Sequence, residues 1–382
     1  MSKTIRLLKI SNFKSIDFLE IKGLSPFSVF AGPNGCGKSN FFDALDFVSL
    51  FIRGGIETAL RQHGGFATIH SEKRRATYAR QFGFEIDCEL PTNAGEQDAL
   101  SRFRYSLTIY NLDSKPKIEE SLSVDGRVQF SREKGGNPVV KSGGEEQPVQ
   151  NFPDDYSALL LAQHVPITEL LRNLNLYRID PIGAKEPDQL DSDPTRLERK
   201  GHNLASVLSR LESNPTIRET ILNWMELIVP GMEKIRTEQQ KLEPKTAIAF
   251  KERGTRRHFP AQMVSDGTIY ALAILVAVLD SPTQYAMTLI EEPERGLHPK
   301  AIRELVGLIR EQATPSNPIW LTTHSESVVR ELRLEELVLV DKRDGRTKMR
   351  AADSGMLTQD NLAPLNLDEA WLSNLLDGGL PW

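Results

Sequence analysis

The chain has 382 residues, 39% of them hydrophobic and 26% charged, which is the composition of a globular protein with a large buried core. Its 47 basic and 52 acidic residues give a net charge of -5, which argues against a protein that coats nucleic acid through bulk charge. The first residues lack the apolar stretch of a signal peptide, so we expect a cytoplasmic protein with no membrane partner.

The first predicted elements are three short strands, a glycine-rich stretch and a helix. The strands cover residues 5–10, 16–21 and 27–31, and the helix covers residues 40–51, with apolar residues on most of its surface. A strand, a glycine loop and a buried helix follow one another in this order in nucleotide-binding cores.

The middle of the chain predicts an antiparallel lobe with several helices. We expect strands at 82–90, 103–110 and 121–130, a flexible loop at 131–150, and helices at 158–174, 203–211 and 216–228. None of these helices carries sustained heptads, which excludes a long coiled coil.

Regular patterning returns in the last third, where helices at 268–279 and 299–312 alternate with strands at 286–290, 319–322 and 337–340. We therefore expect one α/β domain in two halves, interrupted by an inserted lobe. The predicted boundaries are 1–90 and 260–350 for the α/β head, 91–259 for the α+β lobe and 351–382 for a C-terminal tail.

Residues 32–39, with the sequence GPNGCGKS, fit the phosphate-loop pattern G-x-x-x-x-G-K-[ST] in full. The glycines let backbone N–H groups point at phosphates, Lys38 supplies a positive charge, and the Ser39 hydroxyl can ligate Mg²⁺. The candidate nucleotide-binding residues are Asn34, Gly35, Cys36, Gly37, Lys38, Ser39 and Asn40.

The predicted strand at 286–290 ends in two adjacent acids, Glu291 and Glu292. Ligands of open α/β sheets bind at the carboxyl ends of the strands. In such a pair the first acid typically holds the metal and the second polarises the attacking water. The alternative is a solvated helix start, since Glu before Pro293 is ordinary there.

Two further motifs lie on either side of these acids. The segment Val264–Thr268 opens the most hydrophobic helix, and N-capping by Ser265 would be a complete structural explanation for it. Its hydroxyl and the free N–H groups of the helix would also make a second anion site. His324 follows the strand at 319–322, where a histidine is either structural or catalytic.

In content and order these four motifs resemble the ABC-type ATPase superfamily, in which they are the Walker A, signature, Walker B and switch-histidine motifs. The segments NFKS at 12–15 and EEPERGLHP at 291–299 make the sequence most similar to the SMC, RecF and OLD branch. This resemblance implies a P-loop ATPase head of the ABC/SMC type that hydrolyses ATP with Mg²⁺. We refer to Val264–Thr268 as the signature segment.

The resemblance also implies a role for each matching residue. Lys38, Glu292 and His324 would be catalytic, with Glu292 as the general base, and Ser39 and Glu291 would hold the metal. Lys14 would lie near the nucleotide, whereas Ser265 and Gly267 would contact ATP held by a second copy, in a homodimer or higher oligomer. Position 291 is Glu where the superfamily favours Asp. The glutamine that usually contacts magnesium in the superfamily has no clear match in this sequence, and Gln163 and Gln81 are the candidates.

OLD nucleases resemble the front of this chain but continue into a Toprim domain, and the segment after His324 is too short for that fold. We therefore expect an effector that acts in trans, such as a nuclease, because stand-alone ATPases of this kind resemble parts of anti-phage systems. The alternatives are a RecF-like DNA-repair ATPase and an ATP-gated scaffold with little turnover.

Three basic clusters could contact DNA or could simply be solvated faces of the protein. They are residues 73–75 with Arg80, residues 196–200, and residues 253–258 at the tip of a predicted hairpin. In the tail, Trp371, Leu372, Leu375 and Leu376 fall on one helical face. We expect this face to pack on the head, with a partner-binding helix as the alternative.

Overall fold

The computed structural model describes residues 4–70, 80–92, 99–142, 145–189, 192–239, 244–280, 284–354 and 366–381. Its centre is a six-stranded sheet with the order β10-β15-β16-β3-β17-β18. Neighbouring strands are parallel except for the β17–β18 hairpin. The strands are β10 (Leu174–Tyr177), β15 (Met287–Glu291), β16 (Ile319–Thr323), β3 (Phe27–Ala31), β17 (Leu337–Arg343) and β18 (Arg346–Ala351).

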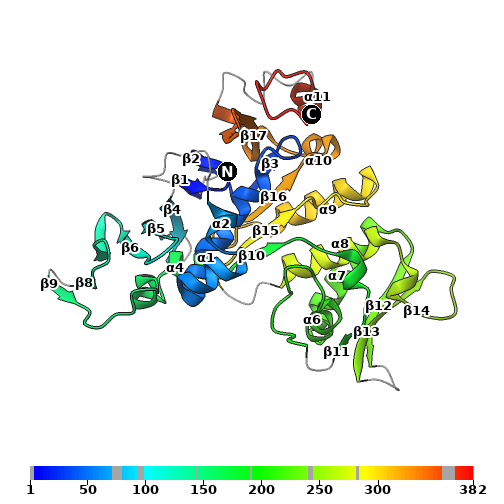
Figure 1. The fold of residues 1–382 in the computed structure, drawn as a ribbon. Helices are drawn as coiled ribbons and strands as arrows, with labels where there is room; N and C mark the ends of the chain where they lie inside the picture. Colours follow the sequence, from blue (N-terminus) through cyan, green and yellow to red (C-terminus); the bar gives the residue numbers. More distant parts are fainter. Residues whose placement is uncertain are drawn as a thin grey trace.

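The central sheet is buried on both faces. Successive side chains of a strand point to opposite sides of the sheet, and here each side contributes to a different hydrophobic core. Phe27 and Val29 of β3 belong to one hydrophobic core, and Phe30 belongs to the other. Figure 1 shows the central strands between α1 on one side and α8 and α9 on the other. These helices are α1 (Lys38–Gln62), α8 (Asp266–Leu279) and α9 (Pro299–Gln312). The predicted α/β class is confirmed.

An eight-stranded antiparallel sheet, in the order β2-β1-β4-β5-β6-β7-β8-β9, shares a core with α1 and with one face of the central sheet. Its strands are β1 (Ile5–Phe13), β2 (Ile16–Leu24), β4 (Phe82–Pro91), β5 (Leu100–Tyr110), β6 (Lys117–Val124), β7 (Arg127–Arg132), β8 (Pro138–Ser142) and β9 (Glu145–Pro148).

Two predictions in this sheet were wrong. The single strand expected at 121–130 is a hairpin, because Asp125 (φ 48°) and Gly126 (φ 78°) form a tight turn. The loop expected at 131–150 holds β8 and β9, and the polar, exposed residues of β9 suit a strand at the edge of a sheet.

The third sheet is small and lies beside α8, to the lower right in Figure 1. Its strands are β11 (Asp188–Gln189), β12 (Met232–Gln239), β13 (Lys245–Glu252) and β14 (Phe259–Pro260), accompanied by α5 (Pro181–Ala184), α6 (Leu204–Leu211) and α7 (Pro215–Ile228). Pairing of β13 with β14 confirms the predicted hairpin around residues 253–258.

The segment at 158–174 is not one helix. It consists of η1 (Ala158–Ala162) and α4 (Pro166–Arg172), and the chain then enters β10. Pro166 begins the second helix, since proline is favoured in a first turn and cannot continue a helix. Thus β10 lies inside the predicted lobe, 91–259, although it is a strand of the central sheet. The eight-stranded sheet likewise crosses residue 90, and the domain boundaries stay a prediction.

The tail folds back on the head. It contains α11 (Leu367–Leu372), which contacts α10 (Glu326–Arg330), and Trp371 is fully buried in the same core as α8 and α9. This confirms the predicted packing for Trp371 and Leu376, while Leu375 is exposed. Within the described ranges, no helix is both long and apolar enough to cross a bilayer.

Candidate functional site

The phosphate loop connects β3 to α1 and has the backbone that its glycines predict. Gly35 (φ 76°) and Gly37 (φ 108°) both adopt the left-handed region, which side chains other than glycine rarely occupy. The buried Lys38 Nζ donates hydrogen bonds to the carbonyl oxygens of Gly32 (2.7 Å) and Pro33 (2.9 Å). Its ammonium group therefore lies inside the curl of the loop.

The β17–β18 hairpin covers this loop. Thr347 of β18 donates a hydrogen bond from Oγ1 to the Cys36 carbonyl oxygen (2.8 Å), and Lys342 of β17 donates to the Gly35 carbonyl oxygen (3.1 Å). A Cβ atom on Gly37 would lie only 1.9 Å from Thr347 Oγ1, so glycine is required for close approach as well as for its φ. Burial raises the pKa of the Cys36 thiol, while Lys38 opposes that shift.

The two predicted metal ligands meet. Ser39 Oγ, at the start of α1, donates to Glu291 Oε2 at 3.1 Å, at the carboxyl end of β15. A hydroxyl and a carboxylate beside a phosphate loop would be suitable oxygen ligands for Mg²⁺. The longer side chain at position 291 therefore still reaches Ser39.

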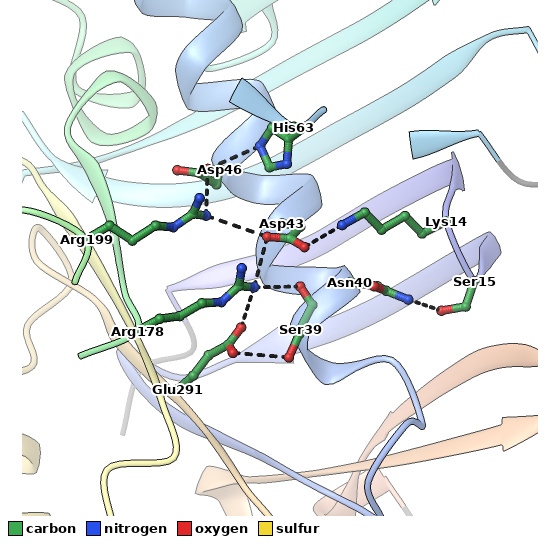
Figure 2. Close-up of polar contacts among 10 residues, drawn as sticks. All are labelled: Lys14, Ser15, Ser39, Asn40, Asp43, Asp46, His63, Arg178, Arg199 and Glu291. Carbon is green, nitrogen blue, oxygen red and sulfur yellow. Dashed lines mark hydrogen bonds and ion pairs between the residues drawn. The ribbon is translucent and has the colours of Figure 1, made fainter. Parts of the chain in front are cut away.

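A residue that the sequence analysis did not single out joins this pair. Arg178, directly after β10, donates from one terminal nitrogen to Glu291 Oε1 (2.7 Å) and Asp43 Oδ1 (2.9 Å). Figure 2 shows the guanidinium group between the two carboxylates. Gln163 caps η1 and Gln81 precedes β4. The described side-chain contacts of Ser39 and Glu291 include Arg178 and neither of these glutamines.

Asp43 anchors a wider charge network on α1, drawn in Figure 2. Lys14 Nζ lies 2.6 Å from Asp43 Oδ2, and Arg199 bridges to Asp46 (2.9 Å), which also faces His63 (3.2 Å). Burial favours the neutral form of Asp43, but the nearby cations Arg178 and Lys14 outweigh it and hold the pKa of the carboxyl below its ordinary value.

Lys14 therefore reaches the metal-ligand region through Asp43. It adopts a positive φ (48°) and its N–H donates to the Ile69 carbonyl oxygen (2.9 Å), so its backbone is fixed. Asn40, whose contact with nucleotide stays a prediction, donates to Ser15 Oγ (2.7 Å). Asn34 is exposed at the rim of the loop.

The predicted base and the predicted switch histidine also meet. Glu292 Oε1 lies 3.2 Å from His324 Nδ1, and Glu292 itself adopts φ 50°. The Tyr270 hydroxyl faces the carbonyl oxygens of Glu291 and Glu292 at 2.9 Å each, which holds this strained turn. A cavity of 760 Å³ borders Glu292 and His324.

The signature segment caps α8. The Thr268 N–H donates to the exposed Ser265 Oγ (3.1 Å), which is the N-cap contact that the sequence predicts. A Cβ atom on Gly267 would lie 2.2 Å from the Gly296 carbonyl oxygen, so the segment packs directly against the turn that follows Glu292. Ser265 makes its described hydrogen bonds within this cap, and none of them joins it to the phosphate loop of its own chain.

The basic clusters have different environments. Residues 73–75 lie outside the described residues. Arg199 is tied to Asp46, and Arg196 donates to the Leu174 carbonyl oxygen (3.2 Å), so part of the second cluster is structural. The third cluster is exposed at residues 253–257, on the β13–β14 hairpin.

The phosphate loop, the acid pair and the histidine meet at the carboxyl edge of one parallel sheet, which defines a P-loop domain of the ABC/SMC-head class. A family model described as "AAA domain, putative AbiEii toxin, Type IV TA system" matches residues 27–330. Because the match covers most of the chain, the protein belongs to this family.

Solved structures of SMC heads share the fold. One is an SMC head bound to the C-winged helix domain of ScpA, with a TM-score of 0.55 and 15% identity over 91% of this chain and 97% of that one. Another is an SMC head with an extended coiled coil bound to the C-terminal domain of ScpA, from Pyrococcus furiosus, with a TM-score of 0.52 and 14% identity over 91% and 95%. Among curated proteins, no match was found.

Proposed function

We propose that the protein is a Mg²⁺-dependent ATPase that dimerises around ATP. The observation that carries the proposal is the 3.1 Å contact between Ser39 Oγ and Glu291 Oε2 beside the phosphate loop. The loop N–H groups and Lys38 would bind the phosphates, and Ser39 with Glu291 would hold Mg²⁺, which neutralises phosphate charge. Glu292 would then take a proton from the attacking water, with His324 orienting its carboxylate.

The dimer part of the proposal rests on the exposed signature segment. Ser265, at the start of α8, is exposed, and its described hydrogen bonds do not reach the chain's own phosphate loop, which suits an anion supplied by a second copy. Beside it, Met263 and Ile182 leave 73% and 70% of their surface exposed. Exposed apolar side chains next to a polar anion site are typical of a protein interface.

We further propose that closure of the dimer acts on a trans-acting effector or on DNA, in anti-phage defence within the cytoplasm. Support for a defence role comes from the family description, which names a toxin of a toxin–antitoxin system. Support for a protein partner comes from the SMC heads, which were solved with ScpA domains bound. The exposed basic residues 253–257 support DNA contact and keep a RecF-like repair ATPase as the second candidate.

The decisive experiment measures the solution mass with ATP and Mg²⁺. Glu292→Gln removes the base but keeps its shape, so ATP should trap a dimer, and adding Lys38→Ala should abolish the dimer. If the solution mass of Glu292→Gln is the same with and without nucleotide while wild type still hydrolyses ATP, Ser265 does not act on a second copy.

Two further measurements separate the alternatives. A scaffold binds ATP and dimerises with negligible phosphate release, whereas an ATPase turns over and Glu292→Gln stops it. A RecF-like protein binds DNA without a partner, with an affinity that falls steeply with salt and with charge removal at Arg256 and Arg257.

A further inference from the structure

Two carboxylates converge on one cationic nitrogen at the proposed metal site. The same terminal nitrogen of Arg178 lies 2.7 Å from Glu291 Oε1 and 2.9 Å from Asp43 Oδ1. It also lies 3.5 Å from the backbone oxygen of Ser39. The guanidinium group is therefore surrounded by oxygen atoms of two carboxylates and a serine, which are the kind of ligands that divalent cations bind.

We propose that Arg178 is a positioning residue that competes with Mg²⁺ for Glu291. The inference rests on the proposed function, in which Glu291 is a metal ligand, and adds how that ligand is controlled. While Arg178 holds Glu291, the carboxylate stays oriented toward Ser39. Mg²⁺ must displace the guanidinium group from Glu291 in order to bind there.

The charge balance around Arg178 explains why the metal should need nucleotide to enter. The network in Figure 2 contains three carboxylates and three fixed cations, namely Asp43, Asp46 and Glu291 with Lys14, Arg178 and Arg199. Asp43 and Glu291 are mostly buried, so their charges are poorly screened by water. A bare divalent ion adds two positive charges to a balanced site, whereas Mg²⁺ with ATP brings its own negative charge.

The competing explanation is that Arg178 only supports the fold, as a buried ion pair joining β10 to α1 and β15. In that case Arg178→Gln would lower stability, and it would change metal affinity no more than removal of another cation from the network does. The competition proposal predicts the opposite for the metal. Removing the arginine leaves two neighbouring carboxylates without their shared cation, and a divalent ion replaces it.

The test is a titration of the full chain with Mn²⁺, followed by electron paramagnetic resonance, without any nucleotide. Arg178→Gln should bind Mn²⁺ about tenfold more tightly than wild type. Arg178→Lys keeps the charge and should stay near wild type. Arg199→Gln is the matched control, since Arg199 belongs to the same network but pairs with Asp46 and Asp43 rather than with Glu291. Adding Glu291→Gln to Arg178→Gln should remove the gain.

The proposal is overturned if Arg178→Gln binds Mn²⁺ no better than wild type while circular dichroism shows it folded, or if Arg199→Gln gives the same gain. The titration is independent of ATP, so its failure is distinct from failure of the proposed function. A fluorescent ADP analogue then tests the functional consequence: Arg178→Gln should need less Mg²⁺ than wild type for half-maximal nucleotide binding.

Discussion

His324 Nδ1 lies 3.2 Å from Glu292 Oε1, and the two residues follow directly after neighbouring parallel strands. The pairing of β15 with β16 fixes this distance, because the Glu292 N–H donates to the Thr322 carbonyl oxygen at 2.9 Å. The proposed base thus lies against the histidine that follows the next strand. A carboxylate held in this way reaches an attacking water without having to reorganise.

His324→Ala should lower ATP turnover by about 100-fold while changing nucleotide affinity little, because the histidine orients Glu292 rather than the loop. Phosphate release and equilibrium binding measure the two effects. His298→Ala is the control: His298 caps α9, where its Nδ1 accepts from the Lys300 N–H (3.3 Å). Equal losses of turnover in the two variants would contradict the assignment.

Gly267→Ala should prevent ATP-dependent dimerisation while a monomer still binds nucleotide. The new methyl group would meet the Gly296 carbonyl oxygen at 2.2 Å, so the start of α8 must shift. Gly307→Ala in α9 is the control, since a Cβ atom there meets no atom within 4 Å, and it should stabilise the fold by about 0.5–1 kcal/mol. Light scattering with ATP and Mg²⁺ on the Glu292→Gln background distinguishes the outcomes.

Trp371→Ala should lower the free energy of unfolding by about 3–5 kcal/mol, because the indole ring is fully buried and its Nε1 donates to the Gly379 carbonyl oxygen (2.7 Å). Leu375→Ala, four residues further on and exposed, should change it by less than about 0.5 kcal/mol. Urea unfolding measures both. A small effect of Trp371→Ala would mean that the tail leaves the head in solution.

Glu294 should make stability depend on pH. Burial raises the pKa of this carboxyl above its ordinary value of 4.5, although Thr323 Oγ1 donates to it at 2.6 Å. Its other oxygen has no hydrogen-bond partner among the residues that the structure describes. The folded state therefore keeps a proton that the unfolded chain releases near pH 4.5. Its contribution to stability is present below that pH and is lost as pH rises through the raised pKa.

Glu294→Gln removes this titration. Relative to wild type, the variant should therefore gain stability as pH is raised above 4.5 through the raised pKa, as followed by urea unfolding at each pH. A difference between the two proteins that stays constant with pH would show that Glu294 is charged in the folded state.

The sequence by itself determined the parts of this protein whose chemistry lies in consecutive residues. The phosphate loop needs glycines at positions 35 and 37, where φ is positive, and it needs Lys38 and Ser39 after them. All of these residues lie within one stretch of eight, 32–39. The acid pair follows from a buried strand that ends in Glu291 and Glu292. These local patterns also predicted an α/β domain, in which ligands bind at the carboxyl ends of the strands.

Tertiary structure alone decided which distant residues complete the site. Arg178 reaches Glu291, 113 residues away, only because β10 pairs beside β15, and a short strand after a helix gives no sequence signal of its partner. Thr347 covers Gly37 for the same reason, through a hairpin that returns over the loop. The strand β9 was missed because its residues are polar and exposed at the edge of the sheet, where no hydrophobic alternation is required. The strand β8 was missed because its two valines are adjacent, so its five residues show no alternation. Such contacts depend on which elements become neighbours in the folded chain, and residue patterns within a single element do not encode that.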